Sequence, residues 1–79
     1  MNMDLGTWSQ RVAAAVRAEM AAQHRSARDL ADVLGVTLPT ANTRLRGSKP
    51  FDLGELDRVS TWLGLSPSEL LARADAPAS

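Results

Sequence analysis

The sequence has no cysteine and only one histidine among its 79 residues. Without cysteine there can be neither a disulfide nor a thiolate metal site, and a single histidine leaves few other ways of holding zinc. The chain also lacks a glycine-rich phosphate loop and a pair of acids held in an apolar setting. We therefore expect no metal, no cofactor, no small-molecule ligand and no catalytic site.

Long apolar runs are missing too. None approaches the roughly 20 residues of a transmembrane helix, and the first residues, MNMDLGTW, lack the basic and apolar regions of a signal peptide. The length suits one small packed core. We expect a soluble, cytoplasmic protein with one domain over residues 1–74 and a frayed tail over residues 75–79.

The net charge is zero, with nine basic and nine acidic residues. This balance argues against a nucleic-acid partner, because DNA affinity comes largely from lysine and arginine on phosphates. The distribution, however, is uneven. Five bases stand against two acids over residues 25–49, and two bases against five acids over residues 50–79. The acidic part is either a solvated face or a means of repelling DNA from all approaches but one.

Residues 26–47 carry the clearest local pattern. Ser26, with Asp29 three positions later, predicts a helix start, and Gly35 predicts its end. Thr37 then caps a second short helix, with Pro39 in its first turn, where a missing amide hydrogen costs little. Two short helices joined at a glycine are the pattern of a helix-turn-helix.

Three further helices complete an all-α prediction. An alanine-rich segment from Leu5 to about Gln23 repeats apolar residues every four positions. It begins at Asp4 or Thr7, both acceptable caps. A fourth helix follows Asp52, and a fifth runs from the Ser66 cap to about Ala74. The predicted inner face of the fourth helix consists of Leu53, Leu56, Val59, Trp62 and Leu63.

In the third helix, Ala41 and Leu45 share one face, and the opposite face carries hydroxyls, an amide and arginines but no acid. A surface helix without a function would more often carry glutamate and lysine pairs. This composition suits an anionic partner.

The chain resembles the XRE family, the lambda-repressor and Cro class of helix-turn-helix DNA-binding domains. The resemblance spans residues 8–71 and is most specific in DLAxxLGVT at 29–37, LxG at 45–47, PFDxxEL at 50–56 and LGLS at 63–66. The last two blocks especially resemble small regulators of actinobacterial phages and chromosomes. The resemblance implies a five-helix lambda-repressor-like fold that places the third helix in the major groove of duplex DNA.

The resemblance also implies roles for particular residues. Those that match the family's base-contacting positions are Leu38, Pro39, Thr40, Asn42 and Thr43. Those that match its phosphate contacts are Ser26, Ala27, Arg28, Thr37, Arg46, Ser48 and Lys49. Free amide groups at helix starts and basic side chains both bind phosphate, so the chemistry agrees with these roles.

The first turn of the third helix departs from the family. Many members carry glutamine or serine where this chain has Leu38 and Pro39, so the bidentate contact from glutamine to adenine is not available there. Leu38 either touches a thymine methyl group or belongs to the core. Arg44 reaches guanine or phosphate, or is a solvated surface residue; we add it to the base-contacting candidates.

Four apolar residues near the end of the chain are either buried or part of a homodimer interface: Trp62, Leu65, Leu70 and Leu71. We expect a small transcriptional regulator, a repressor or Cro-like protein of a phage, prophage or mobile element, that binds double-stranded operator DNA as a dimer. The alternative is an antitoxin-like or anti-repressor module that binds a partner protein with little use of DNA. The zero net charge and the apolar start of the third helix favour the alternative.

Overall fold

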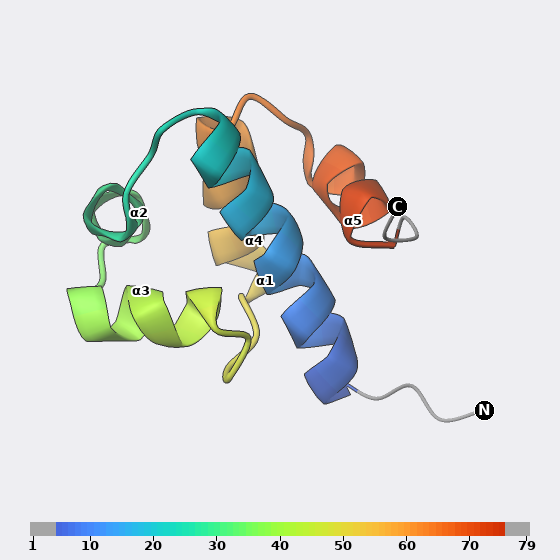
Figure 1. Ribbon diagram of the computed structural model, residues 1–79, viewed down its shortest axis with the longest axis horizontal. Helices are drawn as coiled ribbons and strands as arrows, with labels where there is room; N and C mark the ends of the chain where they lie inside the picture. The colour runs from blue at the N-terminus through green and yellow to red at the C-terminus, as the bar shows by residue number, and fades with distance from the viewer. Residues whose placement is uncertain (1–4, 76–79) are drawn as a thin grey trace.

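The computed structural model describes residues 5–75, which form five helices and no strand. Figure 1 shows α3 lying across the view beneath α2, which is seen nearly end on, and α5 on the far side of α1. Helix α1 packs against α5 and α3, and α2 packs against α3 and α4. The predicted all-α, five-helix architecture is confirmed. The helices are α1 (Leu5–Ala22), α2 (Ala27–Leu34), α3 (Leu38–Leu45), α4 (Leu53–Trp62) and α5 (Pro67–Asp75).

The helix boundaries follow local chemistry. Ser26 caps α2, and its side chain and that of Asp29 bond reciprocally to each other's backbone amide. Thr37 caps α3 by accepting a hydrogen bond from the Thr40 amide. Gly35 ends α2 in the left-handed region, at φ 68°. These predicted caps are confirmed, and they fix the turn between α2 and α3.

At the start of α1 the structure differs from the prediction. The helix already includes Leu5, so Thr7 lies inside it and is not its cap; Asp4 lies outside the described residues. The helix ends without a glycine, because His24 itself adopts the left-handed conformation at φ 56°. The Arg25 amide then donates to the carbonyl of Met20 at 2.8 Å, which satisfies one of the last carbonyl groups of the helix.

The inner face of α4 was predicted wrongly at Leu53, which is 85% exposed. Leu53 precedes the fully buried Val59 by six residues, which places it about 120° around the helix from that residue. Glu55 and Ser60 are buried instead. Their polar atoms are paired, since the Ser60 hydroxyl donates to the Leu56 carbonyl at 2.6 Å and Glu55 completes the cap at Asp52.

Near the end of the chain the structure decides one alternative, at Leu70, and corrects one predicted boundary, at Asp75. Leu70 is fully buried in the core, since it lies on the α5 face that packs against α1 and α4, and it is therefore not available to a partner. Asp75 belongs to α5 and is no part of a frayed tail, because Arg11 donates to its carboxylate at 3.3 Å and to its carbonyl at 3.2 Å. The other tail residues, 76–79, lie outside the described part of the chain.

None of the described helices is long and apolar enough to cross a membrane.

Candidate nucleic-acid interface

Helix α3 is short, and its C-terminal end is held against α1. Its buried residues are Ala41 and Leu45. Arg17 of α1 donates a hydrogen bond to the Leu45 carbonyl. Just beyond the helix, Gly47 lies so close to α1 that an added Cβ would be 2.8 Å from the Cα of Gln10. The end of α3 can therefore approach α1 only because residue 47 is a glycine.

The polar groups on the outer face of α3 differ in whether they are already hydrogen-bonded within the protein. The Thr43 hydroxyl donates to the Pro39 carbonyl at 3.0 Å, and Arg46 in turn donates to that hydroxyl at 3.4 Å. The Thr40 hydroxyl accepts a hydrogen bond from Thr37 at 3.0 Å. Asn42 is half-buried, and within residues 5–75 its side chain makes no hydrogen bond. Its amide keeps both donors and its acceptor free, which is the pattern that pairs with adenine in the major groove.

The first turn of α3 carries the two residues that depart from the family pattern. Leu38 is half-buried but is not among the residues that form or cover the core. Pro39 is exposed. Of the two alternatives for Leu38, the structure favours an apolar surface at the start of the helix over a core position.

Arg44 differs from the other arginines of this region. Its Nε donates to Oε1 of Glu55 at 3.0 Å, and the two side chains are only 18% and 5% exposed. The same Oε1 accepts the Asp52 amide at 3.0 Å. Arg44, predicted to contact bases, is thus paired inside the protein, and its charge is compensated by a nearby carboxylate.

The start of α2 was predicted to bind phosphate through Ser26, Ala27 and Arg28. The Ser26 amide is used by the capping box, but the amides of Ala27 and Arg28 belong to the orphan donors of a first helical turn. The capping bonds from the Ser26 amide and hydroxyl hold the pKa of Asp29 below its ordinary value, with a smaller contribution from Arg25. Asp29 therefore stays ionised at neutral pH, which places one negative charge beside the predicted phosphate contact.

The basic side chains on this side of the protein are not all equivalent. Arg28, Arg46 and Lys49 are exposed, and none of them takes part in an ion pair within the described residues. Ser48, beside Lys49, is exposed as well. One of these cations thus lies at the start of α2 and two lie beyond the end of α3, where Arg17, which donates to the Leu45 carbonyl, is a further cation without an ion pair in the described part of the chain.

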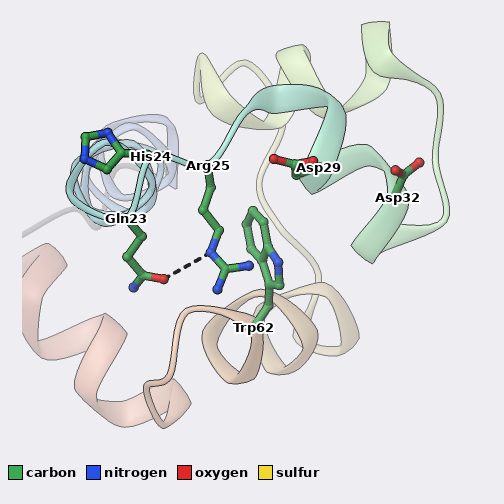
Figure 2. A pocket seen from close by; sticks show the side chains of 6 residues that line it. All are labelled: Gln23, His24, Arg25, Asp29, Asp32 and Trp62. Atoms are coloured by element: carbon green, nitrogen blue, oxygen red, sulfur yellow. Dashed lines mark hydrogen bonds between the residues drawn. The ribbon is translucent and has the colours of Figure 1, made fainter.

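Trp62, predicted to be either buried or part of a dimer interface, has a partner within the protein. Figure 2 shows its ring beside Arg25, whose guanidinium carbon lies 4.8 Å from the ring centroid. Arg25 also donates to Gln23 at 3.1 Å, and Gln23 donates to the Leu63 carbonyl at 2.8 Å. These contacts line an open cleft of about 420 Å³ and join the end of α1 to the end of α4.

The remaining apolar candidates for an interface are half-buried. Leu65 and Leu71 both pack against the core. Leu71 also lines a groove of about 200 Å³ together with Trp8, Phe51 and the exposed Leu53. Leu53, which sequence analysis had assigned to the core, is the exposed large apolar residue of the described chain.

Comparison with known proteins adds a family to this geometry. The family model described as the BetR domain matches residues 6–79. The chain belongs to the BetR domain family. Two crystal structures of ClgR, the clp gene regulator of Corynebacterium glutamicum, resemble this BetR domain with TM-scores of 0.79 and 0.77. Each ClgR chain is 27% identical in sequence to this chain. The matches cover 85% of this chain and 71% and 87% of the two ClgR chains. No curated protein sequence matches it.

One ion pair of the BetR domain, between Arg44 and Glu55, was not predicted from the sequence. The two residues are eleven positions apart and belong to different helices. Helical periodicity carries no information across the intervening loop, so no signal in a single sequence could have indicated this contact.

Proposed function

We propose that this BetR domain binds double-stranded DNA and acts as a transcriptional regulator, with α3 in the major groove. The observation that supports this most is that the Asn42 amide of α3 has no internal partner, while Arg28, Arg46 and Lys49 take part in no ion pair within the described residues. The likeness to ClgR, a gene regulator, supports the same role. Asn42 and Thr43 contact bases, Leu38 and Pro39 make apolar contacts in the groove, and Arg28, Arg46 and Lys49 bind phosphates.

The finer parts of the role are also proposals. The protein is a repressor or Cro-like regulator of a phage, prophage or mobile element, and two copies bind two half-sites about one helical turn, or 34 to 36 Å, apart. Because Leu70 is fully buried, the half-buried Trp62, Leu65 and Leu71 remain of the predicted dimer residues.

Selection from a random duplex library tests the proposal. The protein is expected to enrich one sequence, arranged as an inverted repeat if two copies bind. Sizing chromatography with and without the enriched duplex reports how many copies bind. Recovery of the library without enrichment of any sequence would refute sequence-specific recognition.

A protein-interaction module is the second candidate. It is favoured by the zero net charge and by the exposure of Leu53 beside an apolar groove. The two candidates are separated by alanine substitution of Arg28, Arg46 and Lys49 together. The triple variant loses its DNA binding if DNA is the partner, whereas binding of a protein at the Leu53 face is unaffected.

A further inference from the structure

We infer that Arg44 is a positioning residue, not a DNA-contacting one: its ion pair with Glu55 fixes the orientation of α3 and so aims Asn42 and Thr43. The inference rests on the proposed DNA-binding function. It also reverses the role that the sequence indicates for Arg44, since an arginine on a recognition helix is ordinarily expected to reach guanine or phosphate.

The first argument is geometric. Arg44 follows Asn42 by two residues, which is about 200° around the helix, so the two side chains leave α3 on nearly opposite sides. Asn42 keeps its hydrogen-bonding groups free, whereas the Nε of Arg44 is bonded to Glu55 at 3.0 Å. The side chain of Arg44 is 18% exposed, and its charge is already matched by a carboxylate that is itself buried.

Glu55 connects the end of α3 to the start of α4 through one carboxylate oxygen. One oxygen, Oε1, accepts both the Arg44 Nε and the Asp52 amide, each at 3.0 Å. The Asp52 carboxylate in turn accepts the Glu55 amide at 2.7 Å. The end of α3 is thereby joined to the first turn of α4, on the far side of the loop that carries Ser48 and Lys49. A movement of α3 would break the ion pair and disturb the cap of α4 together.

Helix α3 packs against α2 and α1, so among the described contacts the Arg44 pair is the bond that ties it to α4. The helix has two turns, and its buried side chains are Ala41 and Leu45, the first of which is too small to anchor much. Hydrogen-bonding groups that recognise a ligand must be held within about 0.5 Å of their working position. Arg17 and Gly47 fix the end of α3 against α1, and the Arg44 pair fixes it against α4.

The test uses three variants of the whole chain: Arg44→Met, Glu55→Gln and the two combined. Glutamine at position 55 still offers an oxygen to the Asp52 amide, so the cap of α4 remains. The combined variant leaves no unpaired buried charge, and it therefore folds even where a single variant does not. Arg46→Met is the matched control, because Arg46 is exposed and lies two residues further along. Affinities for the selected duplex and for a scrambled duplex are measured over a series of salt concentrations.

A positioning role predicts that both single variants and the combined variant lose preference for the selected duplex by about tenfold, the effect of one lost base contact. The dependence of log affinity on log salt stays as in the wild type, because no phosphate contact is lost. Arg46→Met weakens binding to both duplexes alike and makes that slope shallower by about 0.9.

Three results would overturn the inference. A slope as shallow in Arg44→Met as in Arg46→Met would make Arg44 a phosphate contact. Tighter binding by Glu55→Gln would mean that the released arginine reaches DNA. Wild-type preference in the combined variant would mean that the pair does not aim α3.

If the wild type itself prefers no sequence, the proposed function fails, and amide hydrogen exchange then decides the inference alone. The combined variant is expected to exchange the amides of the last turn of α3 at least tenfold faster, with α1 unchanged. Unchanged protection of that turn would overturn it.

Discussion

Some side chains of α3 are proposed to contact DNA, and others are bonded within the protein. Which residue does which differs from what their charges indicate. Arg44 has the charge of a DNA contact but is paired with Glu55, whereas Asn42, a neutral residue on the flank, keeps its hydrogen-bonding groups free. The sequence predicted which face of α3 is outermost, because the helical period fixes it. It could not predict which polar groups are already used, because their partners come from other helices.

Substitutions on α3 and just beyond its end separate the proposed base contacts from the proposed phosphate contacts. Asn42→Ala or Thr43→Ala is expected to relax discrimination at one base position by about 1 to 3 kcal/mol, because a specific hydrogen bond is lost. Arg46→Ala or Lys49→Ala weakens binding to all sequences alike. Competition with single-base variants of the selected duplex measures the difference. A uniform loss in Asn42→Ala would show that Asn42 does not discriminate among bases.

Leu70, for which the sequence left burial and an interface open, and Leu53, which it placed in the core, give a stability prediction. Leu70→Ala should lower the free energy of unfolding by about 2 to 5 kcal/mol, since Leu70 is fully buried and its loss leaves a cavity. Leu53→Ala, at a position 85% exposed, should change it by about 0.5 kcal/mol or less. Urea unfolding of both variants tests the pair. Equal losses would contradict the assigned burial.

At the scale of the helices, boundaries were predicted well and inner faces less well. Caps and glycines act within a few residues, so Ser26, Gly35, Thr37 and Asp52 could be identified from sequence alone. The exposure of Leu53 depends on how α4 is rotated against α2 and α5. That rotation is set by tertiary packing, which local sequence does not determine.

The approach of α3 to α1 gives a prediction for two glycines. Both Gly35 and Gly47 have positive φ, at 68° and 75°, so alanine at either position costs about 1 to 2 kcal/mol in backbone strain. Only at Gly47 would the added methyl group also collide with Gln10. Gly47→Ala should therefore be the more destabilising change. Thermal unfolding compares the two, and equal destabilisation would argue against close packing at Gly47.

The capping boxes of α2 and α5 predict a dependence on acid. Hydrogen bonds from the backbone and hydroxyl of Ser26 hold the pKa of Asp29 below its ordinary 3.8, and those of Ser66 hold the pKa of Glu69 below its ordinary 4.5. Because both pKa values are lowered by folding, the stabilisation is present above the ordinary values and is lost as the pH falls through the lowered ones.

Thermal unfolding between pH 6 and pH 2 tests this dependence. The combined Asp29→Asn and Glu69→Gln variant should lose less stability than the wild type below about pH 4, the region where both groups ordinarily titrate. Asp32→Asn makes the same charge change on α2 outside the capping box, so it shows the effect of net charge alone. Identical acid profiles of the wild type and the combined variant would contradict the assignment.

At the scale of the whole molecule, the zero net charge conceals an uneven distribution. Arg11, Arg44 and Arg73 are paired with acids in the described structure. Arg28, Arg46 and Lys49, near α3, are in no ion pair there, and neither is Arg17, which donates to the end of α3. The sequence predicted this basic side from local charge balance. The prediction counted one uncompensated cation too many, Arg44, because its pairing with Glu55 could not be foreseen. The proposed DNA contact therefore depends on few charges, and much of the discrimination on Asn42 and Thr43.

The most direct test of DNA recognition is a salt titration of binding to the selected duplex and to its scrambled counterpart. We expect the protein to bind the selected duplex about 1,000-fold more tightly than the scrambled duplex at physiological salt. Both affinities should fall with salt at a slope near 0.9 for each phosphate contact. Equal affinities for the two duplexes at every salt concentration would contradict it.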